Sequence, residues 1–373
     1  MYADVQLAKR PLFLSDIPLL TKSGIRGFPG IDPAQELLIK VLKGGFDVTG
    51  PLIDLTAMGG IVGHVFSELK PTLIERSKAA LNVLGDQFSD VRCRLASELT
   101  GSYATVLAVL PADRGNEAVE QTLDAAHRLT QPGGLCYLAG DKDKGFDRYF
   151  KWAQARFGTG DILERKKGLR VAGFRQERAL HATAPEITYR IFEEMGLKVA
   201  SLPGTFSAQR IDSASRRLLE NLSALNLSFS GKRVLDIGSG CGVLGAYAAQ
   251  RGAEVYCLED DYGGVLSTRK TFEINGLHGH VLHSDVGSEL GHIAFDLVLT
   301  NPPFHVGHRL ILDVAEAFIE LAGTALKPNG ELFLVANAFL AYEDLLKRWG
   351  TTTEIDRDQS FKVLRGQKRG HSL

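Results

Sequence analysis

The chain lacks an excess of charge of either sign. Its 43 lysines and arginines are offset by 44 aspartates and glutamates, which leaves a formal net charge of −1. A protein that grips nucleic acid by its phosphates usually presents a basic face. Composition therefore gives no sign of a strong binder of naked nucleic acid, and an RNA ligand would be bound weakly or presented within a larger particle.

Cysteine is scarce, and long apolar runs are missing. The four cysteines form no C-x-x-C pair, so they indicate reduced thiols rather than a disulfide framework. Charged residues interrupt the apolar ones at the N-terminus, so neither a secretory signal nor a membrane span is expected. The sequence predicts a cytoplasmic protein. Its 373 residues, 44% of them hydrophobic, are enough for two domain cores.

The most informative motif follows an apolar run. Residues 295–300 predict a buried strand, after which come Asn301, Pro302, Pro303 and Phe304. The Asn301 side chain and the Pro302 carbonyl can both accept from an NH2 group, and the Phe304 ring can stack on a flat substrate. The motif is typical of enzymes that methylate a planar amine. A buried strand that ends in a proline turn is the alternative.

A glycine-rich turn lies upstream. An apolar run that contains Asp236 is followed by Gly238, Gly240, Gly242 and Gly245, a pattern that predicts a strand, a loop and a helix. The last three glycines also match the G-x-G-x-x-G of dinucleotide-binding enzymes. An anionic Asp236 would repel a pyrophosphate but attract the amino group of S-adenosyl-L-methionine. The methyl donor is therefore the predicted ligand.

Two further carboxylates stand where parallel strands are expected to end. Residues 254–258 predict a strand that leads into Glu259, about 20 residues beyond the glycine loop, where a carboxylate can hold both ribose hydroxyls. Residues 280–283 predict the next strand, after which Asp285 would either accept from the adenine amino group or cap a helix. Ligands of parallel sheets bind beyond the strand carboxyl ends, so these carboxylates and Asn301 are expected to share one site.

The segment before this domain is expected to contribute to the site. Residues 202–207 read Leu-Pro-Gly-Thr-Phe-Ser, and Thr205 and Phe206 are candidates for a lid over the cofactor, with a plain loop as the alternative. Asp212 is predicted to cap the helix that follows. That helix is expected to bury one stripe of leucines: Leu218, Leu219, Leu222 and Leu225.

Histidines near these motifs do not predict a metal site. His280 and His283 would point to opposite faces of a strand, which prevents them from binding one ion together. His305 directly follows the Asn-Pro-Pro-Phe motif and is either a group that positions the acceptor or an ordinary surface histidine.

These motifs resemble those of the bacterial small-subunit (16S) ribosomal RNA guanine-N2 methyltransferases. The residues that carry the resemblance are Leu202 to Ser207, Asp236 to Gly240 and Asn301 to His305, with an expected helix over 311–322. The resemblance implies α/β architecture with two tandem class I (Rossmann-like) methyltransferase domains, S-adenosyl-L-methionine as methyl donor, and guanine N2 of small-subunit ribosomal RNA as acceptor. It also implies that the amine is held by Asn301, Pro302 and Phe304.

The donor is expected to contact residues from all these segments. They are Thr205, Phe206, Asp236, Gly238, Gly240, Gly242, Glu259, Asp285 and Asn301.

The front of the chain repeats the motifs of the back. Three segments match three later ones in the same order: 52–63 with 234–245, 107–115 with 299–307, and 131–138 with 327–334. Matches in one order predict a duplicated domain, with copies over residues 1–182 and 183–373. Asp54 aligns with Asp236, and Gly60 with Gly242.

The first copy is expected to be catalytically inactive. Thr56 and Met58 replace two loop glycines, so side chains fill the space of a cofactor, and residues 109–112 read Val-Leu-Pro-Ala in place of Asn-Pro-Pro-Phe. RNA docking and support of the second copy are its expected uses. A buried interface between two α/β domains is the alternative.

Basic residues gather at the end of each half. The first group is Arg165, Lys166, Lys167, Arg170, Arg175 and Arg178, and the second is Lys362, Arg365, Lys368 and Arg369. They are expected to contact phosphates, or else to protect hairpin edges from strand pairing.

Other functions use a similar clamp or fold. They are methylation of a protein glutamine at N5, methylation of adenine N6 in nucleic acid, and non-catalytic RNA binding by an assembly factor. The duplicated front half and Phe304 argue against the first, and the intact second copy argues against the last. A monomer is expected; the modified nucleotide, and whether the substrate is naked or assembled, do not follow from the sequence.

Overall fold

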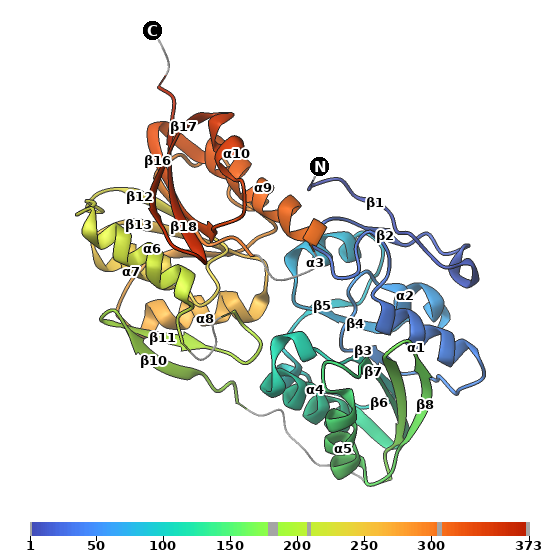
Figure 1. Cartoon of the computed structure of the whole chain (residues 1–373). Coiled ribbons are helices and arrows are strands. Elements are labelled where there is room, and N and C mark those ends of the chain that lie inside the picture. The colour runs from blue at the N-terminus through green and yellow to red at the C-terminus, as the bar shows by residue number, and fades with distance from the viewer. Residues whose placement is uncertain (1, 178–185, 207–209, 304–307, 371–373) are drawn as a thin grey trace. The chain divides into compact units, whose positions relative to one another are not determined.

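The computed structural model describes residues 2–177, 186–206, 210–303 and 308–370 (Figure 1). The chain divides into two compact units, one over Ala3–Thr188 and one over Tyr189–Leu373 together with the first two residues. The predicted boundary between residues 182 and 183 lies outside the described residues. We refer to the units as the first and the second domain.

The second domain is built on a seven-stranded sheet in the order β14-β13-β12-β15-β16-β18-β17. Its first five strands are parallel, and β18 and β17 are antiparallel to their neighbours. The strands are β12 (Arg233–Ile237), β13 (Glu254–Glu259), β14 (His280–His283), β15 (Phe295–Thr300), β16 (Leu326–Asn337), β17 (Gly350–Arg357) and β18 (Phe361–Lys368). The predicted α/β architecture is confirmed.

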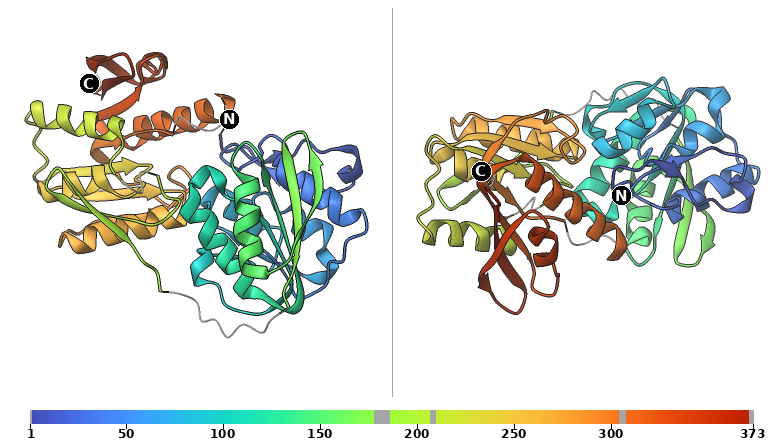
Figure 2. Two further views of the ribbon diagram at one scale, coloured as in Figure 1. Left: turned by 60° about the horizontal axis from the view of Figure 1, so that its bottom comes forward. Right: turned by 90° about the horizontal axis from the view of Figure 1, so that it is seen from above.

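Helices cover both faces of this sheet because its central strands are apolar on both sides. On β15, Leu297 and Leu299 join one buried cluster with α6 and α7, while Val298 joins the other with α9 and α10. Two further views show the helices beside each sheet (Figure 2). The helices are α6 (Ser213–Ala224), α7 (Val243–Gln250), α8 (Tyr262–Ile274), α9 (His308–Ala325) and α10 (Glu343–Lys347).

The first domain repeats this architecture. Its sheet has the order β5-β4-β3-β6-β7-β9-β8, which is the same sequence of connections. The strands are β3 (Leu52–Asp54), β4 (Thr72–Glu75), β5 (Val91–Cys93), β6 (Tyr103–Val109), β7 (Thr130–Asp141), β8 (Asp161–Lys166) and β9 (Leu169–Arg175). Strands β7 and β16 even share the same residue-by-residue burial pattern over 12 residues each. The predicted duplication is confirmed.

The first domain also has two buried clusters, one on each face of the sheet. Alternate residues of β6 join them, with Leu107 and Val109 on the face of α1 and Val106 and Ala108 on that of α4 and α5. The helices are α1 (Pro33–Lys43), α2 (Ile61–Val65), α3 (Lys78–Gly85), α4 (Asn116–Leu129) and α5 (Phe146–Phe157), with short 3-10 helices η1 (Leu12–Leu14), η2 (Ser67–Leu69), η3 (Ala96–Glu98) and η4 (Ala112–Arg114).

Two small hairpins complete the structure. Strand β1 (Gln6–Leu7) pairs with β2 (Leu20–Thr21), and β10 (Arg190–Glu194) pairs with β11 (Leu197–Ser201). Strand β11 packs on α8: the Thr271 hydroxyl accepts from the backbone N–H of Ala200, and the Ser267 hydroxyl accepts from that of Leu202. The hairpin thus positions the Leu-Pro-Gly-Thr-Phe segment that follows it.

The predicted elements of the second domain lie where expected, with one error in the leucine stripe. Asp212 caps α6, and its Oδ1 atom accepts from the backbone N–H groups of Ala214 and Ser215 at 3.0 Å each. Leu218, Leu219 and Leu222 are buried. Leu225 is 45% exposed, because the helix ends before it and turns it away from the core.

None of the described helices is long and apolar enough to cross a membrane. All four cysteines are free thiols, as the sequence predicted.

The first domain keeps the framework of the glycine loop, with Thr56 and Met58 in place of two glycines. The Glu75 carboxylate at the end of β4 accepts from the backbone N–H of Met58 at 2.8 Å and of Ser77 at 2.9 Å. The Thr56 hydroxyl accepts from the N–H of Val109 at 2.8 Å. Met58 is 5% exposed, so its side chain occupies the core beside the loop. The loop is therefore tied to β4 and β6 by its own hydrogen bonds.

The two carboxylate oxygens of Asp54 differ in their surroundings, and this difference leads to a testable prediction. Its Oδ1 atom accepts from the Thr56 N–H at 3.0 Å, whereas Oδ2 is buried without a partner among the described residues. Burial raises the pKa of Asp54 to about 7. When the pKa of a carboxyl group is higher in the folded than in the unfolded protein, the group contributes its full stabilisation only at pH values below its unfolded-state pKa. This contribution is lost as the pH rises through the folded-state pKa, here about 7. We expect Asp54→Asn to stabilise the first domain by on the order of 2–4 kcal/mol at pH 8 and not at pH 4.5.

Urea unfolding of the full chain checks this, with Trp152 of α5 as the reporter in a Trp349→Phe background. Exposed Asp143 of the same domain supplies the matched control, Asp143→Asn. A gain from Asp54→Asn that is equal at both pH values would show that ionisation of Asp54 is not its source.

Candidate active site

The glycine loop begins at the carboxyl end of β12, and its path depends on left-handed backbone conformations. Gly238, Gly240 and Gly242 have φ of 75°, 57° and 79°. Gly238 and Gly240 line a pocket. A Cβ on Gly242 would lie 2.7 Å from the side chain of Thr268 on α8, so this glycine allows α7 to start close to α8. Gly242 was expected to contact the cofactor, and here its closest neighbours belong to α8.

Asp236 lies at the base of this loop and is fully buried. Its Oδ2 atom accepts from the Gly245 N–H at 2.9 Å, and Oδ1 has no partner within the described part of the chain. Burial raises the pKa of Asp236 to about 7. A buried acceptor without a donor fits a cationic ligand group such as the amino group of S-adenosyl-L-methionine.

Glu259 ends β13 and faces the loop. Its Oε2 atom accepts from the Gly240 N–H at 2.6 Å, and Oε1 accepts from the Asp261 N–H at 2.9 Å. Burial raises the pKa of Glu259 to about 7. The same pair of contacts ties Glu75 to the first-domain loop, where Met58 stands in place of Gly240.

The segment before α6 lies against the glycine loop. Thr205 is buried and its hydroxyl donates to the Leu202 carbonyl at 2.6 Å. The Phe206 carbonyl accepts from the Cys241 thiol at 3.2 Å, while the Phe206 side chain is 51% exposed and lines the pocket. Burial raises the pKa of Cys241 to about 12, so this thiol stays protonated and acts as a donor. Ser207 lies outside the described residues.

Asp285 follows β14 and begins a turn, in which its carbonyl accepts from the Ser288 N–H at 3.1 Å. No helix starts there, so the helix-cap alternative does not apply. The Oδ1 atom of Asp285 accepts from the hydroxyl of Tyr2 at 2.8 Å. Tyr2 belongs to the same compact unit, and no sequence pattern pointed to it.

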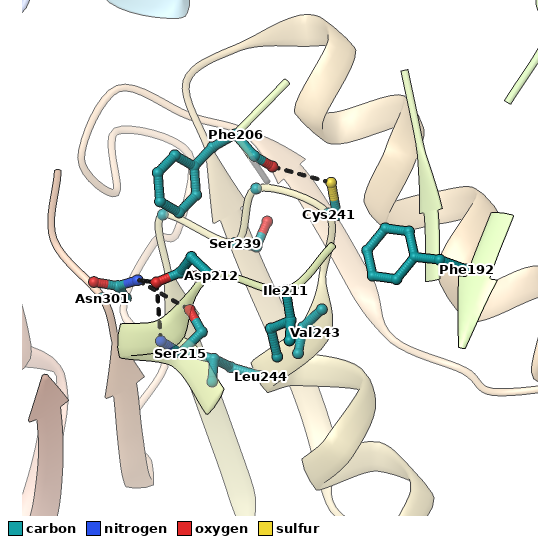
Figure 3. A pocket seen from close by; sticks show the side chains of 12 residues that line it. Phe192, Phe206, Ile211, Asp212, Ser215, Ser239, Cys241, Val243, Leu244 and Asn301 are labelled. Atoms are coloured by element: carbon teal, nitrogen blue, oxygen red, sulfur yellow. Dashed lines mark hydrogen bonds between the residues drawn. The ribbon is translucent and has the colours of Figure 1, made fainter. Parts of the chain in front are cut away.

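Asn301 directly follows β15, and its side-chain amide faces the start of α6 (Figure 3). The Nδ2 atom donates to Asp212 Oδ1 at 3.1 Å and to Ser215 Oγ at 2.9 Å. The Oδ1 atom is buried and has no partner among the described residues. The amide of Asn301 is therefore oriented with its nitrogen toward α6 and its oxygen away from Asp212 and Ser215.

The rest of the clamp is described only in part. Pro302 is buried and Pro303 is exposed. Phe304 and His305, the predicted stacking ring and its neighbour, lie outside the described residues.

Four of the predicted site residues, Phe206, Gly238, Gly240 and Asn301, line one pocket (Figure 3). Thr205, Asp236, Gly242, Glu259 and Asp285 are not among the residues that line it. The pocket is lined by Phe192, Phe206, Ile211, Asp212, Ser215, Gly238, Ser239, Gly240, Cys241, Val243, Leu244 and Asn301. Asp212, Ser215 and Cys241 were not among the predicted site residues. The helix-cap pattern at Asp212 was visible in the sequence, but its contact with Asn301 was not.

His280 and His283 contact different partners. His280 stacks on Tyr256 with ring centroids 4.3 Å apart, and His283 Nε2 lies 2.7 Å from the Asp260 carbonyl. Over the described part of the chain, no group of three or more His, Cys, Asp or Glu side chains could hold a metal ion.

The fold and the site define a class I methyltransferase that uses S-adenosyl-L-methionine. Residues 196–365 match the family model "Methyltransferase small domain". The chain is 35% identical over 274 residues to Ribosomal RNA small subunit methyltransferase C of Stutzerimonas stutzeri, a match that covers 71% of this chain and 79% of that protein. The chain belongs to the family of ribosomal RNA small subunit methyltransferase C.

Two more comparisons agree. The protein of the same name from Chromohalobacter salexigens is 39% identical over 188 residues, which cover 50% of this chain and 56% of the relative. A solved structure described as T. Thermophilus 16S rRNA N2 G1207 methyltransferase (RsmC) in complex with AdoMet and Guanosine is 38% identical, with a TM-score of 0.88 and 99% of each chain covered. The predicted family resemblance is confirmed.

Proposed function

We propose that the protein transfers the methyl group of S-adenosyl-L-methionine to the exocyclic N2 amine of a guanine in small-subunit ribosomal RNA. The observation that carries this proposal is the Asn301 amide, which offers a buried oxygen without a partner among the described residues at the carboxyl end of β15. Such an oxygen is complementary to an NH2 group and not to a keto group. The names of the relatives support ribosomal RNA as the source of that amine.

The chain's residues have to align two reactants more than supply acid or base, and the proton that N2 loses once it is methylated passes to solvent water. S-adenosyl-L-methionine brings a methyl group on a sulfonium, whose leaving group is a neutral thioether. Guanine N2 is a poor nucleophile because its lone pair is delocalised into the ring. Acceptance of its hydrogens by Asn301 Oδ1 and the Pro302 carbonyl would turn the lone pair toward the methyl carbon. Alignment of this kind contributes several kcal/mol to a bimolecular reaction, on the order of 7–11 kcal/mol in the best cases.

We place the donor along the carboxyl ends of the strands. Asp236 Oδ1 suits the amino group, and Glu259, beside Gly240, suits the ribose hydroxyls. Thr205 and Phe206 approach the loop from the other side. Asp285 suits the adenine amino group, with the hydroxyl of Tyr2 as its neighbour.

A groove next to the pocket is a candidate path for the RNA strand. It has a volume of about 780 Å³ and shares Ile211 and Asp212 with the pocket. Arg210, Arg216 and Arg217 line it, but Arg216 pairs with Glu194 and Arg217 with Asp356. Because these charges are largely balanced within the protein, we expect modest affinity for naked RNA.

The two basic groups differ in their surroundings. In the first, Arg165, Lys166 and Lys167 are exposed at the β8–β9 turn, where they are accessible to phosphates. In the second, Lys362 is 2% exposed and pairs with Glu343, and Lys368 donates to main-chain carbonyls. We therefore propose the β8–β9 turn as the RNA-docking element of the first domain. We further propose that the protein acts as a monomer in the cytoplasm.

Methyl transfer to defined RNAs tests the function. The protein is incubated with methyl-labelled S-adenosyl-L-methionine and either naked or assembled small-subunit ribosomal RNA, and the RNA is digested to nucleosides for mass spectrometry. Label in N2-methylguanosine is the expected result, with the assembled form preferred. Label in N6-methyladenosine, or no label in either RNA while donor binding persists, would overturn the proposal.

A further inference from the structure

We infer that Asp212 and Ser215, at the start of α6, are positioning residues that hold the Asn301 amide with its oxygen toward the acceptor. The inference deepens the proposed function and rests on it. It follows from the chemistry of the two ends of the amide, which have nearly the same shape and opposite hydrogen-bonding character.

Asp212 determines which end of the amide faces α6. Its Oδ1 atom already accepts from two backbone N–H groups at the start of the helix, so this oxygen is an acceptor and cannot donate. Only the nitrogen of Asn301 can face it at 3.1 Å. A flipped amide would place two oxygens against each other and lose the hydrogen bond.

Ser215 takes the second hydrogen of the same amide. Its hydroxyl oxygen lies 2.9 Å from Asn301 Nδ2, and the serine is 8% exposed. An amide nitrogen has two hydrogens, and these two contacts use both. Of the Asn301 side chain, the oxygen is then the group left for a ligand.

The helix that carries both residues is fixed to the sheet. Leu218 and Leu219 are fully buried, and the Nδ2 atom of Asn221 donates to Asp356 on β17 at 2.8 Å. Arg217 Nε lies 2.7 Å from the same carboxylate. Asp212 and Ser215 therefore act from a rigid base, as a group that sets the orientation of another must.

This arrangement also gives the site a specificity. With its nitrogen engaged by α6, Asn301 accepts from an amine and repels a keto oxygen, so guanine N2 is selected over guanine O6 at the same position. If Asn301 were free to rotate, the same pocket would hold either group.

Two substitutions at position 212 separate positioning from helix capping. Serine and asparagine both cap helices well, so Asp212→Ser and Asp212→Asn should leave α6 equally stable. Asparagine can still place a carbonyl oxygen toward Asn301, whereas the serine hydroxyl is too short. We expect Asp212→Ser to lower kcat by roughly 10- to 100-fold and Asp212→Asn by less than about threefold, with donor affinity unchanged in both.

A double-mutant cycle shows whether the effect acts through Asn301. In an Asn301→Ala background, Asp212→Ser should cause no further loss, and Ser215→Ala should behave likewise. Equal losses in both backgrounds, or equal kcat for the serine and asparagine variants, would overturn the inference.

The side-chain amide resonances of Asn301 give a readout without turnover. They are assigned by their disappearance in Asn301→Ala, and they should shift more in Asp212→Ser, which loses the hydrogen bond, than in Asp212→Asn, which keeps it. Unchanged resonances in Asp212→Ser would contradict the positioning role. Failure of the wild-type protein to form N2-methylguanosine would instead refute the proposed function, and the resonance test would still decide the contact.

Discussion

Replacement of Asn301 with alanine is expected to lower the rate of methyl transfer by roughly 100- to 1,000-fold, a loss comparable to removal of one preorganised hydrogen-bonding group from an enzyme site. The amide oxygen is the buried acceptor that has no partner within the described residues. Its removal leaves the acceptor amine with the Pro302 carbonyl alone and its lone pair unaligned. Asp236 and Glu259, which are expected to hold the donor, are untouched by the substitution, so donor affinity should stay within about threefold.

Single-turnover methylation and calorimetric titration with the donor measure the two effects separately. Gln250→Ala removes an amide from the exposed surface of the same domain and serves as the control. An unimpaired rate in Asn301→Ala would refute the assigned role. A loss of donor binding as large as the loss of rate would assign Asn301 to the cofactor rather than to the acceptor.

The sequence predicts the strand ends of this site because each is marked locally. Asp236, Glu259 and Asn301 each follow an apolar run, and parallel strands bring such positions to one edge of the sheet. The sequence also predicts the duplication, because motifs that recur in the same order imply that the two domains connect their strands in the same way. Both sheets have the same strand order.

Contacts between distant segments could not be predicted. In the sequence, the helix-capping pattern is enough to explain Asp212. In the structure its carboxylate also accepts a hydrogen bond from Asn301, which is 89 residues away. Tyr2 and Asp285 are 283 residues apart. Such pairs are set by how α6 and the N-terminal residues pack on the sheet edge, and no single-sequence periodicity encodes that packing.

The exposure of a run of basic residues is a second feature that the sequence does not predict. Lys362 was grouped with three other basic residues as a phosphate contact, but it is buried and paired with Glu343. A lysine in a strand can extend its ammonium to a carboxylate on a neighbouring helix, here α10. A run of basic residues therefore does not by itself show an exposed basic surface.

The affinity for the donor should rise with pH between pH 6 and pH 7.5. Burial raises the pKa of both Asp236 and Glu259 to about 7. The ionised form of Asp236 suits a cationic amino group, and the ionised form of Glu259 accepts from hydroxyls, so each carboxyl must lose its proton before or during binding. Below pH 7 this proton release costs affinity. We expect a gain of roughly 5- to 10-fold for each carboxyl over this interval, or roughly 25- to 100-fold for both.

Calorimetric titration with S-adenosylhomocysteine checks this, because that ligand keeps the amino and ribose groups and cannot react. In two buffers of different ionisation enthalpy at pH 6.5, the difference in binding heat counts the protons released. Glu259→Gln should remove one proton and one part of the pH dependence, whereas Glu75→Gln, at the equivalent position of the first domain, should remove neither. Binding that is independent of pH, or proton release that survives loss of both Asp236 and Glu259, would show that neither carboxylate ionises to receive the donor.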